Sequence, residues 1–236
     1  MKSKHLKTTT KLNNQLFDSL SDEWWNENGP FKALHSYNLI RLKYIIENVN
    51  KTSLSKLKIL DVGCGGGILC EPLARLGADV TGVDENKKAI EVAKSHSKIN
   101  KLKINYRNIN LNQITNKSFD VITCMEVLEH VDDVNQIISD SAHLLKSGGI
   151  FIGSTINKTF SSYLFAIFAA EKILKVVPEK THSWEKLVKP NTLKVDFLKN
   201  GFFNFNYNGV IYNPLTNSWR HSSLTNINYM FYAFKA

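Results

Sequence analysis

Short apolar runs alternate along the chain with segments whose apolar residues have helical spacing. The runs of strand length lie at 57–62, 79–84, 103–107, 119–125 and 150–155. Segments with helical spacing follow three of these runs, at 68–76, 89–93 and 134–145. This alternation predicts an α/β fold with a largely parallel sheet, because parallel strands need a crossover connection between them. Ligands of such sheets bind at the carboxyl ends of the strands.

The pattern also indicates the domain organisation. Residues 17–236 form a single predicted domain, without repeats or an internal linker, and residues 1–16 read as a flexible basic segment. Residues 17–50 are predicted to form a helical cap before the first strand, and residues 157–190 an insertion after the fifth. The C-terminal part is expected to hold a helix and an antiparallel strand pair that closes the sheet, at 193–198, 202–212 and 228–235.

A glycine-rich loop ends the first predicted strand, and Asp84 ends the second. Glycine permits a tight turn and lets the backbone approach a ligand closely. A carboxylate at the end of the second strand accepts hydrogen bonds from ribose hydroxyls in nucleotide-binding sheets. The dinucleotide pattern Gly-x-Gly-x-x-Gly fails, because position 68 is Ile, whereas Gly-x-Gly-x-Gly fits at Gly63, Gly65 and Gly67. The alternative is a plain turn and a surface Asp that caps the next helix.

Three polar side chains, Glu126, Glu129 and His130, follow the fourth predicted strand. A helix there would place them on one face through i, i+3 and i, i+4 spacing. In one hypothesis Glu129 and His130 are catalytic, with His130 as a general base, or the trio binds a divalent cation such as Mg²⁺; either would help to ionise a phenol. In the other, the acids stabilise a helix start and His130 packs locally. His182, in a predicted loop, is a second candidate base or an ordinary surface histidine.

The predicted cap at 17–50 is rich in aromatic residues, among them Trp24, Trp25 and Phe31. They are suited to cover an apolar substrate at the ligand crevice, and core packing is the competing interpretation. Arg41 lies on a mostly apolar helical segment and is a candidate partner for a ligand carboxylate.

Composition and charge narrow the possible partners. The chain has 236 residues, 43% of them hydrophobic, and a net charge of +9. No apolar run approaches the ~20 residues of a membrane span, and the three cysteines have no metal or redox spacing. The charge favours anionic surfaces, or reflects a lysine-rich solvated surface. Residues 160–177 place lysines opposite apolar residues, which is typical of a helix on an anionic membrane surface or of one packed on the core.

Several motifs together resemble one family, the ubiquinone-biosynthesis O-methyltransferases of the S-adenosylmethionine-dependent class I. The resemblance rests on Asp61-Val-Gly-Cys-Gly-Gly-Gly67, Trp24-Trp25, Thr123-Cys-Met-Glu-x-Leu-Glu-His-Val131, Tyr212-Asn-Pro-x-Thr-Asn217 and Asn228-Tyr-Met230. It implies a Rossmann-like, mostly parallel seven-stranded sheet with helices on both faces, a helical N-terminal extension and a helical insertion after the fifth strand. It also implies S-adenosylmethionine contacts at Arg41, Gly63, Asp84 and Met125, and the loop adds Gly65.

The family resemblance implies two O-methylations, on a polyprenyl-hydroxyphenol and on demethylubiquinol. Eukaryotic relatives are associated with a divalent cation on the element that here is Glu126, Glu129 and His130. The expected partners are a polyprenyl phenol or quinol, an anionic membrane surface bound through 160–177, and other ubiquinone-biosynthesis enzymes. The expected location is cytoplasmic, at the inner face of the membrane.

Two other classes of function compete with this interpretation. A nucleic-acid methyltransferase would use the positive charge, but the chain shows no basic stripe interleaved with aromatic residues, so no nucleic-acid partner is expected. A non-catalytic scaffold would not need the intact cofactor motif.

Overall fold

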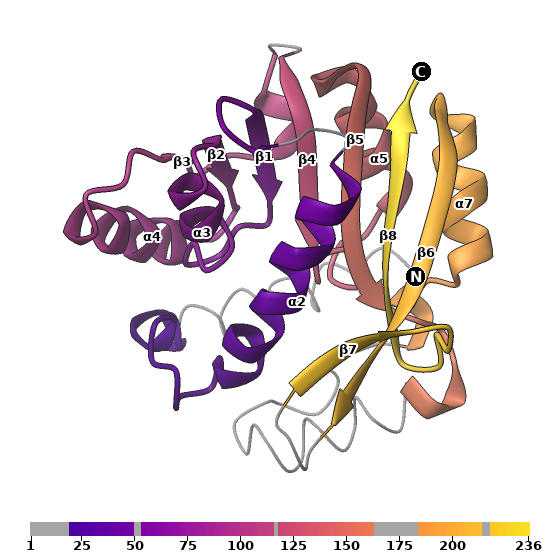
Figure 1. Ribbon diagram of the computed structural model, residues 1–236, viewed down its shortest axis with the longest axis horizontal. Coiled ribbons are helices and arrows are strands. Elements are labelled where there is room, and N and C mark those ends of the chain that lie inside the picture. Colours follow the sequence, from indigo (N-terminus) through magenta and orange to yellow (C-terminus); the bar gives the residue numbers. More distant parts are fainter. Residues whose placement is uncertain (1–18, 50–52, 116–117, 163–183, 214–217) are drawn as a thin grey trace, which may run out of the picture.

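The computed structural model describes residues 19–49, 53–115, 118–162, 184–213 and 218–236. Within them, one eight-stranded sheet has the strand order β3-β2-β1-β4-β5-β8-β6-β7 (Figure 1). Its strands are β1 (Lys58–Val62), β2 (Asp79–Val83), β3 (Asn105–Arg107), β4 (Phe119–Met125), β5 (Leu145–Ile156), β6 (Phe202–Asn213), β7 (Ser218–Ser222) and β8 (Asn228–Lys235).

The first five strands are parallel, and the last three are antiparallel to their neighbours. The α-helices are α2 (Lys32–Asn48), α3 (Cys70–Arg75), α4 (Lys87–Ile99), α5 (Val134–Leu144) and α7 (Pro190–Lys199). Short 3-10 helices add η1 (Ser21–Glu23), η2 (Leu111–Gln113) and η3 (Trp184–Lys186). The predicted Rossmann-like class is confirmed.

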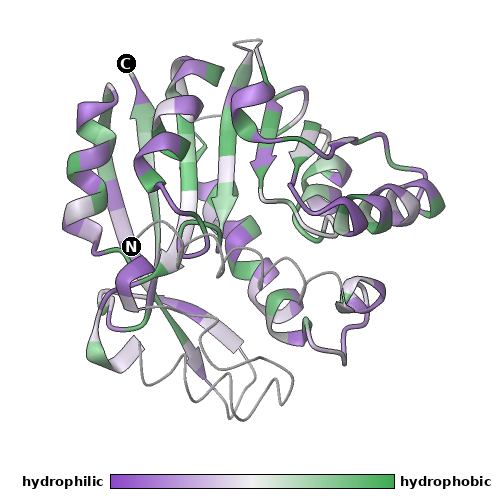
Figure 2. Cartoon of the chain, turned by 180° about the vertical axis from the view of Figure 1, so that it is seen from behind, coloured by the Kyte–Doolittle hydropathy of each residue, from purple (hydrophilic) through white to green (hydrophobic). Residues whose placement is uncertain are grey.

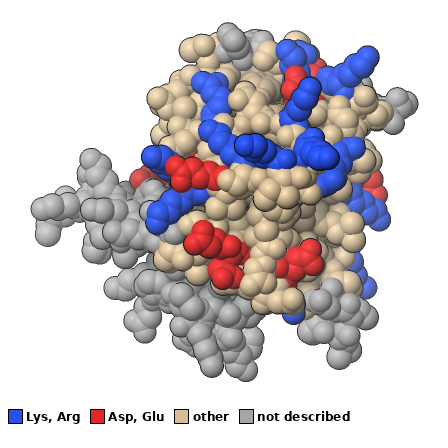
Figure 3. All heavy atoms as spheres, turned by 90° about the vertical axis from the view of Figure 1, so that its left-hand side faces the viewer, with Lys and Arg blue, Asp and Glu red and all other residues tan. Residues whose placement is uncertain are grey.

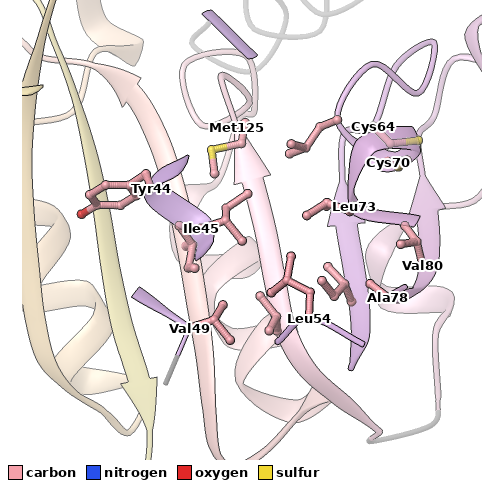
Figure 4. Close-up of a cluster of buried hydrophobic side chains, with 14 of the residues drawn as sticks. Tyr44, Ile45, Val49, Leu54, Cys64, Cys70, Leu73, Ala78, Val80 and Met125 are labelled. Carbon is pink, nitrogen blue, oxygen red and sulfur yellow. The ribbon is translucent and has the colours of Figure 1, made fainter. Parts of the chain in front are cut away.

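Helices cover both faces of the sheet. Buried residues of α2, α3 and α4 form one core cluster with one face, and buried residues of α5 and α7 form another with the opposite face. Figure 4 shows part of the first cluster, where Ile45 of α2 lies near Met125 at the end of β4. In β1, Ile59 belongs to the first cluster and Leu60 to the second. A strand buried on both faces reads as a continuous apolar run, which is why the pattern located it.

Hydrophobic residues concentrate in the central strands, and hydrophilic ones line the outer sides of the helices (Figure 2). Among the parts of the chain that the structure describes, no helix combines the length and apolarity that crossing a bilayer requires.

The sheet has one strand more than the predicted seven. The additional strand, β7, pairs with β6 at the edge of the sheet and is only partly buried. Its sequence, Ser-Trp-Arg-His-Ser, has no apolar alternation, because an edge strand that is not fully covered needs none. Residues 163–183, with His182 and most of the amphipathic segment 160–177, lie outside the described residues, as do residues 1–16.

Candidate active site

The glycine loop and Asp84 form one hydrogen-bonded unit at the carboxyl ends of β1 and β2. Gly63 and Gly65 have φ angles of 68° and 51°, which only glycine adopts without strain. The Asp84 carboxylate accepts hydrogen bonds from the Gly65 amide (2.9 Å) and the Asn86 amide (2.7 Å). Burial raises the pKa of Asp84, and the two amides lower it. Asp84 therefore stabilises the conformation of the loop, and it also lines the cavity next to the loop.

A cavity of about 500 Å³ opens at these strand ends. The five predicted cofactor residues all line it: Arg41, Gly63, Gly65, Asp84 and Met125. They come from α2, the glycine loop, the end of β2 and the end of β4, segments far apart in the sequence. The fold thus assembles the predicted set in one place, at the position where α/β sheets bind ligands.

Arg41 projects from α2 into this cavity and is only 5% exposed. Its guanidinium lies 4.6 Å from the centre of the Tyr37 ring, and its Nη2 lies 4.0 Å from Glu126 Oε1. Within the described residues, its Nε and Nη2 have no hydrogen-bond partner. Buried donors that are left unsatisfied are costly. A ligand carboxylate, which arginine binds through two parallel hydrogen bonds, would satisfy them.

The cavity is lined with acids although the whole chain is basic. These acids are Asp61, Asp84, Glu85, Glu126, Asp132, Asp133 and Asp140. Elsewhere on the surface, lysines and arginines gather in a band (Figure 3). A cavity of this kind attracts a cationic ligand. S-adenosylmethionine carries a sulfonium, an ammonium and a carboxylate, so the donor set fits it: acids for the two cations and Arg41 for the carboxylate.

Glu126 and Glu129 lie behind the cofactor residues and are held by β5. Ser154 Oγ donates to Glu126 Oε1 (2.6 Å), and Thr155 Oγ1 donates to Glu129 Oε2 (2.8 Å). Burial and the neighbouring Glu129 raise the pKa of Glu126 to about 7, against the lowering effect of Arg41. Burial also raises the pKa of Glu129. Glu126 lines the cavity, whereas Glu129 is 2% exposed and is not among the lining residues.

The helical face predicted for Glu126, Glu129 and His130 is wrong. Residues 126–133 form a bend and a turn, with Glu126 at a φ of 56°, and α5 begins only at Val134. The reason is Asp133, whose side chain accepts a hydrogen bond from the Gln136 amide and so caps the helix there.

His130 lines the cavity from this turn. Burial lowers its pKa to about 4, so the imidazole is neutral at pH 7. Its carbonyl accepts a hydrogen bond from Lys186 Nζ (3.1 Å), which also pairs with Asp132 (2.9 Å). Across the described ranges, no group of three or more His, Cys, Asp or Glu side chains is arranged to hold a metal ion.

The predicted cofactor set omits Asp61, which also lines the cavity. Asp61 is buried in β1, where it accepts hydrogen bonds from Thr123 Oγ1 (2.6 Å) and Cys70 Sγ (3.2 Å), and burial raises its pKa to about 6. Its signal was a carboxylate inside an otherwise apolar strand, directly before the loop. Trp24 also lines the cavity while packing in a small core cluster with Phe31 and Ile68. Trp24 therefore fits both interpretations of the aromatic cap, since it lies at the ligand cavity and also packs in a core cluster.

The fold and this site define a Rossmann-like class I methyltransferase of the S-adenosylmethionine-dependent type. Residues 60–153 match the family model described as a methyltransferase domain. The magnesium protoporphyrin IX methyltransferase of Synechocystis, solved with bound SAH, superimposes with a TM-score of 0.63 at 21% identity, over 86% of this chain and 83% of that one.

Two curated relatives narrow the class. The chain is 47% identical to the ubiquinone biosynthesis O-methyltransferase of Pelagibacter ubique, over 91% of this chain and 93% of the relative. It is 43% identical to that of Bartonella tribocorum, over 92% of both. The chain belongs to the ubiquinone biosynthesis O-methyltransferase family.

Proposed function

We propose that the chain methylates polyprenylated catechol and hydroquinone intermediates of ubiquinone biosynthesis on oxygen, at both O-methylation steps, with S-adenosylmethionine as donor. The observation that carries the proposal is Arg41, whose buried, unsatisfied donors face an acid-lined cavity at the carboxyl ends of the parallel strands. The names of the relatives supply the substrate class.

Each cofactor residue has a role that its position supports. Arg41 binds the methionine carboxylate, and Asp84 accepts hydrogen bonds from the ribose hydroxyls. Gly63 and Gly65 allow the tight left-handed turn that forms one side of the cavity, and Met125 lines the cavity with an apolar side chain. When bound, S-adenosylmethionine supplies an activated methyl group on a positively charged sulfur.

The remaining task of the protein is to position and ionise the substrate hydroxyl. Correct alignment of two reactants contributes up to ~7–11 kcal/mol to the rate. A phenol ionises near pH 10, so forming the phenolate at pH 7 costs roughly 4 kcal/mol at 1.36 kcal/mol per pH unit.

The turn at 126–130 holds the candidate proton acceptors, Glu126 and His130, which both line the cavity. A pKa of about 7 matches Glu126 to this task at neutral pH, whereas a pKa of about 4 makes His130 a weaker base. Glu129 acts through Glu126, because the two carboxyl groups influence each other's pKa. His182 remains a candidate from the sequence alone.

A Mg²⁺ ion at Glu126, Glu129 and His130 remains a prediction. Magnesium demands octahedral oxygen ligands and usually keeps several waters. The two glutamates already accept hydrogen bonds from Ser154 and Thr155, so binding would require these contacts to rearrange. Loss of activity on chelation, with recovery on adding Mg²⁺, is the result that would support the ion.

Association with an anionic membrane surface is the finer part of the proposal. Residues 160–177 carry the amphipathic pattern, and Phe160 at its start is 71% exposed. An exposed apolar side chain, in a segment whose sequence also carries lysines, suits an acidic lipid interface. Deleting residues 160–177 should abolish sedimentation with anionic vesicles; unchanged binding would refute this role.

The reaction is tested with labelled S-adenosylmethionine and a short-tailed prenyl catechol, with and without a chelator. We expect transfer by the wild type and its loss in Glu126→Ala. Loss in His130→Ala but not in Glu126→Ala would transfer the role of base to His130. Cofactor binding without any transfer would mean that the substrate class is wrong.

A further inference from the structure

One glycine of the loop is not explained by backbone conformation. Gly66 has no positive φ angle, unlike Gly63, Gly65 and Gly67, so its backbone would accept a side chain. The obstacle is Trp24, since a Cβ atom on Gly66 would lie 2.5 Å from Trp24 Cγ. A Cβ atom on Gly65 would likewise lie 2.5 Å from Trp24 Cη2. The loop is therefore packed against an indole that arrives from outside the β1–α3 unit.

Trp25 holds the same loop through a hydrogen bond. Its indole Nε1 donates to the Gly66 carbonyl at 3.0 Å. Its ring stacks on His96 of α4, with ring centres 3.5 Å apart and planes 8° apart. His96 Nδ1 in turn lies 2.7 Å from Glu71 Oε1, on the helix that follows the loop. The Trp25 ring is thus fixed between the loop and α4, whose His96 is in turn bound to Glu71 of α3.

Trp24 is itself firmly held. It is 7% exposed and stacks on Phe31 at a centroid distance of 4.0 Å. Its carbonyl is bonded to His35 Nε2 at 2.8 Å. Asn38, one helical turn further along α2, donates to the Ile68 carbonyl just after the loop (2.8 Å). The segment from Trp24 to Arg41 therefore contacts the glycine loop as well as supplying Arg41 to the cavity.

We propose that Trp24 and Trp25 are positioning residues of the cofactor site: the Trp24 ring is the wall that shapes Gly65 and Gly66, and the Trp25 N–H fixes the Gly66 peptide. Position 66 must then be glycine because a Cβ atom there would clash with Trp24, and not because the cofactor needs the space. The segment that holds Trp24 and Trp25 is therefore part of the cofactor site, independently of any role in substrate binding. This inference rests on the proposed cofactor, and its first test measures cofactor binding without methyl transfer.

The test is a double-mutant cycle of Trp24→Ala and Gly66→Ala, read out as the Kd of S-adenosylhomocysteine by calorimetry. Gly66→Ala in the wild-type background should weaken binding by about tenfold, as overpacking does. In the Trp24→Ala background the same change should have less than about threefold effect, because the clash is gone. Equal effects in both backgrounds would mean that the methyl group meets the cofactor, and would overturn the proposal.

Trp25→Phe provides a test that keeps the aromatic stack and removes only the donor. We expect the KM for S-adenosylmethionine to rise by about fivefold, the loss of one hydrogen bond, with kcat unchanged. Trp184→Phe, a substitution of a 40% exposed tryptophan that does not line the cavity, should change neither value. An unchanged KM in Trp25→Phe would overturn the role of its N–H. If the folded wild type failed to bind S-adenosylhomocysteine, the proposed cofactor and not this inference would be refuted.

Discussion

Arg41 is a buried charge whose partners are incomplete without a ligand. Its nearest carboxylate, that of Glu126, is 4.0 Å away, and Tyr37 offers only the face of its ring. Burying a charge is unfavourable unless it is paired and hydrogen-bonded. Arg41 therefore destabilises the free protein, and it increases the affinity for a ligand that carries a carboxylate.

Replacing Arg41 tests this trade. Arg41→Ala should weaken S-adenosylhomocysteine binding by about 30-fold or more, as loss of one partner of a buried charge pair does. Arg41→Lys should recover only part of the affinity, because lysine lacks the planar fork. The measurement is calorimetric titration. Lys43→Ala, on the exposed side of the same helix, is the control and should bind normally.

Glu126 predicts a pH dependence of stability. Burial raises its pKa from 4.5 to about 7, so the folded protein binds its proton more tightly than the unfolded chain does. Ionisation of Glu126 therefore lowers the free energy of unfolding of the protein as the pH rises from about 4.5 through 7, by up to about 3 kcal/mol. Glu126→Gln, which keeps an acceptor for Ser154, should be more stable relative to the wild type at pH 8 than at pH 5.

Urea unfolding at the two pH values measures this difference. The same difference at pH 5 and pH 8 would show that Glu126 does not titrate in this range in the folded protein.

At the scale of elements, the hydrophobic pattern predicted the parallel strands and the helices between them. β1 and β4 were visible because strands buried on both faces are continuously apolar. The turn at 126–133 was missed because the pattern of acids and histidine also fits a helix; the choice depends on Asp133, one polar residue among several. The edge strand β7 gave no signal because only part of it is buried.

The cofactor set was predictable because its signals are local: glycines in a turn and an acid at a strand end. Trp24 was not, because its role depends on a contact with Gly66, 42 positions along the chain. The partnership of Glu126 with Ser154 and of Glu129 with Thr155 likewise depends on the pairing of β4 with β5.

The cap of α5 gives the prediction at this scale. Asp133→Ala should destabilise the protein by about 1 kcal/mol, because the Gln136 amide loses its acceptor. Asp133→Asn retains an acceptor oxygen and should stay close to the wild type. Chemical denaturation of the three proteins gives the comparison; equal stabilities of Asp133→Ala and the wild type would contradict the capping role.

For the whole molecule, the basic surface and the acid-lined cavity differ in charge, and they suit two different partners: the proposed anionic membrane surface and the cationic cofactor. A net charge of +9 favours an anionic surface, while the acids at the strand ends favour a cationic cofactor. The cavity also joins segments from α2 to α5, so its ligand should stabilise the fold as a unit. S-adenosylhomocysteine at 100 times its Kd should raise the free energy of unfolding by about 2.7 kcal/mol; an unshifted unfolding curve at that concentration would show that the ligand does not bind the folded cavity in preference to the unfolded chain.

The most direct test of the account is the fate of the methyl group. The chain is given S-adenosylmethionine with a carbon-13 methyl group and a short-tailed prenyl catechol, and the product is analysed by NMR. The account predicts one labelled methyl group on a phenol oxygen and its loss in Arg41→Ala at low cofactor concentration. Label on a ring carbon, or no product while the cofactor is bound, would contradict it.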